Sequence, residues 1–327
     1  MGRRSFNKKN VGLRHMKMKK TTVSVGIPAF NEEANIAYLL RALLADSSKG
    51  VSLKEVIIVS DGSTDASVVR ARSVNDRRIK IINRKQRLGI VATQNELLRH
   101  VQGDILVMLD ADVIPVQSDF LDRITEPIRR NRNIGLVGAA TIPLRPQTVF
   151  ERVITNSHYM KQYIYKQING GHNVYLCHGR ARAFAKALYE KLHWVNNCPE
   201  DAYSYFACIT RGFKFSYTIK AGVYFRSPQI LEGHVKQSTR FVAGIKKIKK
   251  IFGIELAQKE YKIPRLLFMR SLIKYLWRNP FSTPAYLLLT LYIRLAYTND
   301  RVYRSQFSVS QSSKRIVLFK GQKLSRI

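Results

Sequence analysis

The sequence predicts an α/β fold in which helices cover both faces of a mostly parallel sheet. Two observations carry this prediction. Short, continuously apolar runs alternate with amphipathic helices over the first third of the chain, which is the pattern of parallel strands buried on both faces. The 327 residues, 45% of them hydrophobic, are enough for one large domain of this kind with additions.

The predicted strands and helices of the first third place three polar clusters at strand ends. The strands cover residues 22–28, 55–60, 78–83 and 104–109, and the helices cover 32–45, 65–73 and 90–101. The clusters are Pro28–Glu32 (PAFNE), Asp61–Asp65 (DGSTD) and Asp110–Asp112 (DAD). Ligands bind beyond the carboxyl ends of the strands in such sheets, so the clusters predict a binding site at one edge.

The second half of the chain is less regular. We expect helices at 115–130, 148–168 and 200–211, strands at 134–142, 213–219 and 223–225, and an extended stretch that runs into a helix over 176–190. After Gln237 the pattern changes to basic amphipathic helices. We expect these C-terminal helices to be added to the α/β domain.

Positive charge is concentrated at the two ends of the chain. The sequence has 56 Lys and Arg against 22 Asp and Glu, a net charge of +34, and residues 1–20 together with 234–327 contribute 25 of these charges. Such an excess favours an anionic partner, which can be a nucleic acid, an acidic lipid surface or a phosphorylated substrate. Composition alone does not choose among the three.

Cysteine usage and the N-terminal segment favour a cytoplasmic protein. Cys177, Cys198 and Cys208 form no CxxC pair, which favours unpaired, buried thiols in a reducing compartment. Residues 1–20 lack the apolar segment of a cleavable signal peptide. We expect them to be a solvated basic tail.

Asp110 and Asp112 directly follow the apolar run at 104–109. Two carboxylates one residue apart repel each other unless a cation lies between them. Mg²⁺ takes one or two carboxylates and completes its shell from substrate phosphates. The alternative is that Asp110 caps the next turn while Asp112 is solvated. The position beyond a strand end favours the metal.

Two further acidic clusters admit a structural and a functional interpretation. DGSTD is a good turn and capping sequence, but a carboxylate at a strand end, such as Asp61, can also accept an N–H of a nucleobase. Asn31 and Glu32 pose the same choice between a helix start and a nucleotide contact. Glu200 and Asp201 open the 200–211 helix; one acid suffices for capping, and a paired carboxylate can serve as a general base.

Other catalytic motifs are missing from the sequence. His172 and His178 have no third ligand at metal spacing, so we assign them no metal. No GxxxxGK[ST] loop, and no GxGxxG after a strand, is present. The chemistry is therefore expected to rest on the carboxylates.

In their order along the chain, the motifs resemble family 2 glycosyltransferases. They are PAFNE (28–32), VSDGSTD (59–65), Gly89 with Asn95, LDAD (109–112), HGRARAF (178–184), PED (199–201) and QSTRF (237–241). The resemblance runs from about residue 22 to 245. It implies the GT-A fold, which is a Rossmann-like, mostly parallel α/β sheet, and an inverting enzyme that uses a nucleotide-sugar, most simply a UDP-sugar.

The resemblance also implies roles for these residues. The donor-binding residues would be Pro28, Asn31, Glu32, Asp61, Asp110, Asp112, Gln237 and Arg240. Among them, Asp61 would contact the base, and Asp112 would hold Mg²⁺ or Mn²⁺ against the diphosphate. Asp201 would be the general base that deprotonates the acceptor hydroxyl.

QSTRF resembles the QxxRW motif of the membrane-bound hyaluronan, chitin and cellulose synthases. By this resemblance Gln237 and Arg240 face the diphosphate. Phe241, with Glu200 and Gly179, would line the acceptor subsite. Phe241 stands where those synthases have Trp, which weakens the inference to a long-chain acceptor.

The sequence favours attachment to a membrane surface over a span. Mean hydropathy is −0.19, and the most apolar segment, Pro284–Tyr297, is shorter than the about 20 residues that cross a bilayer. Residues 245–252 and 263–277 have the pattern of basic amphipathic helices that lie in the headgroup plane. The alternative is that these helices pack on the catalytic domain and their charges are solvated.

These expectations divide the chain into five segments. They are a basic tail at 1–20, a nucleotide-sugar-binding half at 21–112, an acceptor-binding half at 113–241, membrane-surface helices at 242–300 and a basic tail at 301–327. The predicted function is transfer of a sugar to a lipid-linked or polysaccharide acceptor at the cytoplasmic face of the membrane.

Three other classes compete with this function. A sugar-nucleotide-forming nucleotidyltransferase needs a Gly-rich loop where PAFNE stands. A nucleic-acid-binding protein would rest on charge alone, so nucleic acid is not the expected partner. A degenerate, non-catalytic family member would not need all three acidic clusters.

Overall fold

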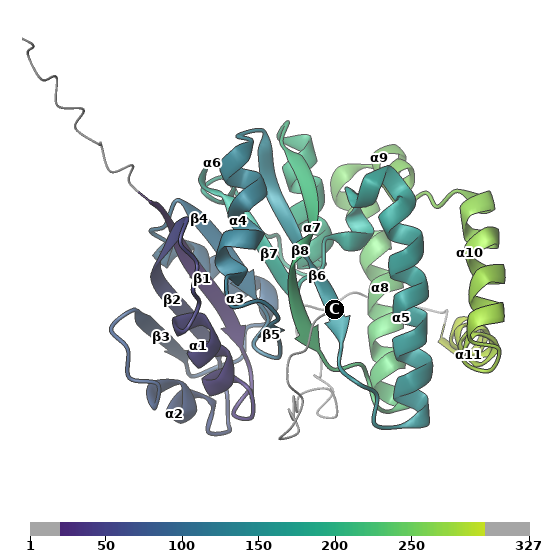
Figure 1. The fold of residues 1–327 in the computed structure, drawn as a ribbon, viewed down its shortest axis with the longest axis horizontal. Helices are drawn as coiled ribbons and strands as arrows, with labels where there is room; N and C mark the ends of the chain where they lie inside the picture. Colours follow the sequence, from purple (N-terminus) through teal and green to yellow (C-terminus); the bar gives the residue numbers. More distant parts are fainter. Residues whose placement is uncertain (1–19, 298–327) are drawn as a thin grey trace, which may run out of the picture.

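A computed structural model describes residues 20–297 and shows one eight-stranded sheet in the order β3-β2-β1-β4-β7-β6-β8-β5 (Figure 1). Strands β1 to β4 are mutually parallel, and β6 and β8 are parallel to each other. β7 runs antiparallel to β4 and β6, and β5 runs antiparallel to β8. The predicted α/β fold with a mostly parallel sheet is confirmed. Apart from Lys20, the two predicted tails lie outside the described residues.

The elements follow the predicted alternation of strands and helices. The strands are β1 (Thr21–Ala29), β2 (Val51–Asp61), β3 (Ile79–Arg84), β4 (Ile105–Leu109), β5 (Ile114–Pro115), β6 (Ile134–Pro143), β7 (Ala181–Ala185) and β8 (Lys214–Phe225). The helices of the α/β domain are α1 (Ile36–Leu44), α2 (Ser67–Arg72), α3 (Ile90–His100), α4 (Phe120–Arg130), α5 (Val149–Gln167), α6 (Lys186–Tyr189) and α7 (Glu200–Thr210). Four helices follow: α8 (Leu231–Phe252), α9 (Ile254–Glu260), α10 (Arg265–Arg278) and α11 (Ser282–Tyr297).

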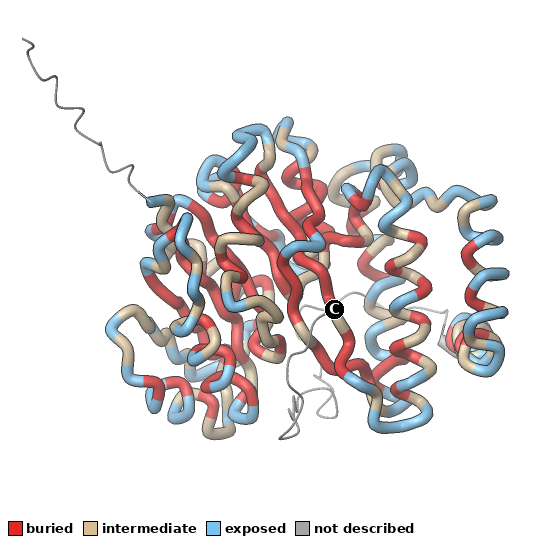
Figure 2. The backbone as a smooth tube through the Cα atoms, in the orientation of Figure 1, coloured by how far each residue is buried: buried red, intermediate tan, exposed pale blue. Residues whose placement is uncertain are grey.

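The strands of the sheet are largely buried (Figure 2). Their apolar side chains alternate between two cores, one on each face. On β4, Val107 packs with α1 and α4 on one face, and Leu106 and Met108 pack with α3 and α7 on the other. Side chains alternate in this way along any strand. A third, smaller cluster, centred on Ile164 and Tyr275, joins α5 to α10 and α11.

The structure differs from the predicted elements in three places. The two strands expected at 213–219 and 223–225 form the single strand β8, whose register with β6 shifts between Ala139 and Ala140. The two-residue strand β5 was too short to show a pattern. Helix α8 begins at Leu231, one and a half turns before Gln237.

A buried ion pair fastens α5 to the segment after β8. Arg226 Nη1 lies 2.9 Å from Glu151 Oε1, and the two side chains are 4% and 0% exposed. Breaking a buried pair leaves an uncompensated charge, so we expect Arg226→Met to lower the free energy of unfolding by roughly 3–5 kcal/mol. Urea unfolding measures this change. The control is Lys236→Met, which removes the exposed pair with Glu232; equal losses in the two variants would contradict the prediction.

Candidate active site

The polar clusters after β1, β2 and β4 lie at one edge of the sheet. The parallel register aligns Pro28 with Val59, and Gly26 with Met108. Residues that follow these strands therefore meet at the same edge, as the sequence predicted. Pro28 itself is a buried part of β1, and its predicted donor contact stays a prediction.

Asp61, which ends β2, fixes the loop between β3 and α3. Its carboxylate oxygens accept hydrogen bonds from the backbone N–H groups of Leu88 and Gly89, each at 2.8 Å. Arg84 Nη1 lies 3.5 Å from Oδ1 of the same carboxylate. Each carboxylate oxygen has a second lone pair, so these bonds are compatible with the nucleobase contact, which stays a prediction.

Asn31 and Glu32 tie the turn after β1 to the turn after β2. Asn31 has a φ of 53°, a conformation that Asn adopts more readily than most residues, and its Oδ1 accepts from Thr64 N–H at 2.8 Å. The Glu32 N–H donates to Ser67 Oγ at 2.6 Å, and Glu32 Oε2 accepts from Asn35 at 3.0 Å. These contacts are structural, and a direct nucleotide contact by either residue stays a prediction.

Asp110 and Asp112 lie near Arg180, a partly exposed arginine to which the sequence assigned no role. The Asp110 N–H donates to the Arg180 carbonyl at 3.0 Å. The Arg180 guanidinium stacks on the Phe225 ring at 3.8 Å and is close enough to both aspartates to interact electrostatically. Burial, followed by the charge of Asp112, raises the pKa of Asp110 to about 7. One cation therefore offsets part of the negative charge at this edge.

The acids of the donor edge and of the α7 N-terminus meet at Gly179. A Cβ atom at Gly179 would lie 3.5 Å from Glu200 Oε1 and 4.0 Å from Asp110 Oδ2. Burial, then the charge of Asp201, raises the pKa of Glu200. Asp201 Oδ1 accepts from Ala202 N–H at 2.7 Å. Two clusters about 90 positions apart in the sequence thus form one acidic centre.

Arg182 and Trp194 hold the α7 N-terminus, and the sequence analysis gave neither a role. Arg182 is 0% exposed on β7, and its Nη1 donates to the Glu200 carbonyl at 3.0 Å and to Ser204 Oγ at 2.8 Å. Trp194 Nε1 donates to the same carbonyl at 2.9 Å. Trp194 is in turn bonded to Asn95 of α3 at 3.0 and 2.8 Å. Helix α7 is therefore anchored to the sheet and to α3.

Gln237, Arg240 and Phe241 lie on α8, and Arg240 is near the acids of the α7 N-terminus. Arg240 interacts electrostatically with Glu200 and Arg180. Phe241 is 52% exposed, and its ring meets Tyr261 edge-on at 6.5 Å. Gln237 is exposed. The phosphate and acceptor contacts predicted for these three residues are untested by the structure.

The second half of α8 packs on the domain, in contrast to the membrane-surface role predicted for 245–252. Ile248 is fully buried, and Phe252 stacks on Phe206 of α7 at 5.4 Å. The apolar side of this half of α8 is therefore already covered by α7 and α9. Lys246 and Lys250 remain exposed.

Neither His172 nor His178 belongs to a metal cluster. His172 Nδ1 accepts from Tyr217 N–H at 3.1 Å, a structural contact. His178 lies 6.4 Å from His158, ring to ring, and burial lowers the pKa of His178 to about 3. The imidazoles of His158 and His178 are therefore both neutral at physiological pH, since desolvation also lowers the pKa of His158.

A divalent metal fits Asp112 if the substrate supplies the other ligands. Among residues 20–297, no group of three or more His, Cys, Asp or Glu side chains could hold a metal by itself. Asp112 and Asp110 are both partly exposed, so their carboxylates can be reached by a ligand. Carboxylate, phosphate and water oxygens are the ligands that Mg²⁺ and Mn²⁺ prefer. The donor set therefore suits a metal that arrives with a diphosphate.

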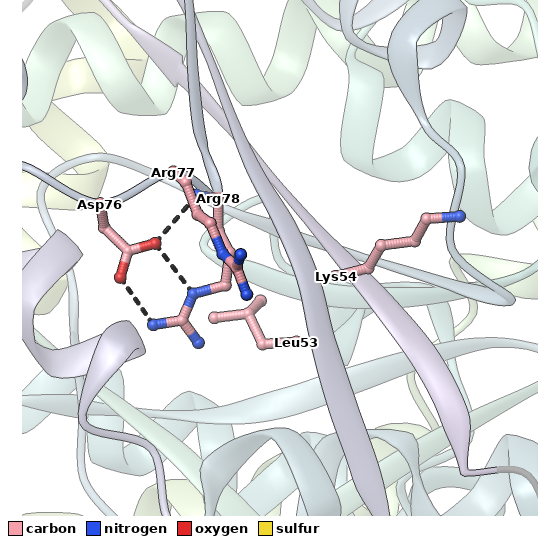
Figure 3. Close-up of a pocket in the computed structure, with 5 residues that line it drawn as sticks. All are labelled: Leu53, Lys54, Asp76, Arg77 and Arg78. Atoms are coloured by element: carbon pink, nitrogen blue, oxygen red, sulfur yellow. Dashed lines mark hydrogen bonds and ion pairs between the residues drawn. The ribbon is translucent and has the colours of Figure 1, made fainter.

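A shallow pocket at the opposite end of the sheet is separate from this centre. It is lined by Leu53, Lys54, Asp76, Arg77 and Arg78, where β2 and β3 begin (Figure 3). Asp76 is hydrogen-bonded to Arg78 at 2.9 and 2.8 Å, and this contact lowers the pKa of Asp76 to about 2. The pocket carries none of the predicted site residues.

The sheet order and the acidic edge define a GT-A glycosyltransferase domain. A family model described as glycosyl transferase family 2 matches residues 24–193, and the chain belongs to this family. As a member of this family it is a glycosyltransferase, and this membership decides against a sugar-nucleotide-forming nucleotidyltransferase.

Three similar proteins illustrate the range of the family. A dodecaprenyl-phosphate galacturonate synthase from Rhizobium johnstonii is 29% identical over 119 residues, which cover 36% of this chain and only 35% of that protein. A mannosyltransferase from Pyrobaculum calidifontis, solved with GDP-mannose and Mn²⁺, has 19% identity and a TM-score of 0.52 over 86% of this chain and 76% of its own. A glucosyl-3-phosphoglycerate synthase from Mycobacterium tuberculosis, solved with Mn²⁺, UDP and phosphoglyceric acid, has 20% identity and a TM-score of 0.51 over 69% and 78%.

Proposed function

We propose that this glycosyltransferase moves a sugar from a nucleotide-sugar, a UDP-sugar, to an acceptor hydroxyl with inversion at the anomeric carbon. The observation that supports it most is the meeting of two acidic clusters at Gly179. Asp110 ends the donor-binding half, and Glu200 begins α7 of the acceptor-binding half. Donor and acceptor can therefore share one reaction centre.

Donor binding would use the acidic edge and α8. Asp112 would hold Mg²⁺ or Mn²⁺, which supplies positive charge to the departing diphosphate when it is bound. Gln237 and Arg240 would bind the diphosphate oxygens, since a guanidinium suits bidentate phosphate contacts. Two solved relatives contain Mn²⁺ with a guanine or a uracil nucleotide, so a test of the donor site needs both bases.

Asp201 would act as the general base. It lies in the first turn of α7, which Arg182 and Trp194 fix through the Glu200 carbonyl. A carboxylate held on a rigid element can take the proton of the acceptor hydroxyl as that oxygen attacks the anomeric carbon. Glu200, beside it, would line the acceptor subsite with Gly179 and Phe241.

The proposed acceptor is lipid-linked or a polysaccharide, at the cytoplasmic face of a membrane. The name of the Rhizobium relative includes a polyprenyl phosphate, and the C-terminal helices are basic. Among the described residues, no helix has the length and apolar character to cross a bilayer. The enzyme would therefore reach its acceptor from the membrane surface.

Removing the charge of Asp112 tests the donor site. We expect UDP or GDP with Mn²⁺ to raise the melting temperature of the wild type, since ligand at 100 times its Kd adds about 2.7 kcal/mol to stability. Asp112→Asn should lose the Mn²⁺-dependent part of this shift. Thermal unfolding with each nucleotide, with and without Mn²⁺, measures it.

The matched control for this experiment is Asp119→Asn, which changes an aspartate paired with Arg123 on α4. It should keep the full shift. A shift of normal size in Asp112→Asn, or none in the wild type with either nucleotide, would refute the donor site.

A further inference from the structure

Helix α10 has apolar residues on two faces, and only one of these faces packs against the rest of the protein. Tyr275 and Ser271 are buried against α5. Leu266, Ile273 and Trp277 lie on the other side and are 66%, 52% and 85% exposed. These positions are separated by seven and four residues, so they form one stripe along the helix. Figure 2 shows the exposed side of α10 turned away from the rest of the molecule.

The turn after α10 and the helix α11 add further exposed apolar side chains. Phe281 is 87% exposed, and Leu288 and Leu295 on α11 are 67% and 76% exposed. We call the stripe of α10, Phe281 and the exposed leucines of α11 the terminal apolar surface. Contiguous exposed apolar surface of this kind marks an interaction site.

The charge around this surface has one sign. Residues 261–297 contain six Lys or Arg and no Asp or Glu. Arg270 and Arg278 are exposed on α10, and Lys274 Nζ lies 4.1 Å from the Tyr163 ring centre. Aromatic and aliphatic side chains flanked only by cations complement an anionic lipid surface, where Trp prefers the headgroup level.

The surface is connected to the helix that carries the predicted diphosphate ligands. α11 packs on α5 and α8, and the Tyr286 ring lies 6.1 Å from the ring of His234 on α8. His234 is one turn before Gln237. A membrane that holds α10 and α11 would therefore orient α8 and the reaction centre relative to the lipid.

We propose that α10 and α11 lie in the plane of an anionic membrane, with Trp277 and Phe281 inserted below the headgroups and Arg270 and Arg278 among the phosphates. This surface replaces the second half of α8 as the anchor. The link to a lipid-linked acceptor rests on the proposed function. Membrane binding itself does not, because it is measured without sugar transfer.

The two tryptophans provide a built-in probe. Trp194 is 0% exposed and Trp277 is 85% exposed, so a change of emission on adding vesicles reports Trp277. With the full chain we expect phosphatidylglycerol vesicles to shift the emission to shorter wavelength, and phosphatidylcholine vesicles to do so much less. Phe281→Ser keeps the probe and should weaken vesicle binding by roughly tenfold or more.

Matched variants separate anchoring from general effects. Tyr38→Ser with Val69→Ser removes side chains that are 62% and 68% exposed on α1 and α2, and should bind vesicles normally. Arg270→Gln with Arg278→Gln should lose the preference for anionic lipid. All variants should keep the Mn²⁺-dependent nucleotide shift, so loss of anchoring is distinguished from loss of the donor site.

Two outcomes would overturn the proposal. One is an unchanged Trp277 emission with anionic vesicles. The other is a concentration-dependent dimer that Phe281→Ser dissociates, without vesicle binding, because the surface would then join two copies of the chain.

Discussion

Asp201→Asn is expected to reduce kcat by roughly 10²–10⁴-fold, because the acceptor hydroxyl loses its proton acceptor. The substitution keeps the shape of the side chain and the oxygen that accepts from Ala202 N–H at 2.7 Å. The first turn of α7 should therefore keep its structure. Nucleotide binding with Mn²⁺ should be normal, because the donor residues are unchanged. Release of nucleotide diphosphate, with membrane extract as acceptor, measures the loss.

Glu200, the acid next to Asp201, provides a control for the assignment of the general base. Glu200→Gln alters the carboxyl that borders Gly179 and Asp110, so it should weaken acceptor binding more than it lowers kcat. Should Glu200→Gln instead lower kcat more than Asp201→Asn does, the assignment of the base is wrong. Full activity in both variants, with the fold intact by circular dichroism, would reject general-base catalysis at α7.

The first half of the α/β domain, which we propose binds the donor, was predictable because its signals are local. A strand such as β4 is one unbroken apolar run, and a parallel sheet places every strand end at a known edge. Asp61 and Asp110 could therefore be located from the sequence alone. The hydrogen bonds of Asp61 to Leu88 and Gly89 could not, because they depend on how the loop before α3 folds back over β2.

The C-terminal helices show what an amphipathic pattern leaves open. The stripe through Ile248 and Phe252 predicted a surface anchor, yet both side chains pack inward against α7 and α9. An apolar stripe predicts that one face of a helix is covered, but it does not identify what covers that face. The sequence of α10 has apolar residues on two sides, and only the fold shows that Tyr275 faces α5 while Trp277 remains exposed.

Arg182 illustrates a signal that was present in the sequence. It is the second residue of the strand ARAFA, which pairs on both sides and is buried. A charged residue in such a strand needs a polar partner in the interior. Arg182 finds the Glu200 carbonyl and Ser204. Its Nε and Nη2 have no hydrogen-bond partner among the described residues, and its charge interacts electrostatically with Glu200.

The effect of Arg182 on the acidic centre is electrostatic as well as structural. Its positive charge lowers the pKa of Glu200, against burial and Asp201, which raise it. Removing the cation raises the pKa of Glu200 further, so this carboxyl keeps its proton to higher pH. If Glu200 must be ionised for turnover, the acidic limb of the pH–rate profile then moves to higher pH.

We therefore expect Arg182→Met to lower kcat/KM by up to about 100-fold, since α7 loses one of its anchors at the reaction centre, and to move the acidic limb upward. Arg182→Lys keeps the positive charge but loses the forked guanidinium. The acidic limb of this variant should therefore lie where it does in the wild type, while kcat/KM stays low. Steady-state rates across the pH range measure both effects. If Arg182 served packing alone, both variants would have a lower melting temperature. The acidic limb of their pH–rate profiles would then lie at the same pH as in the wild type.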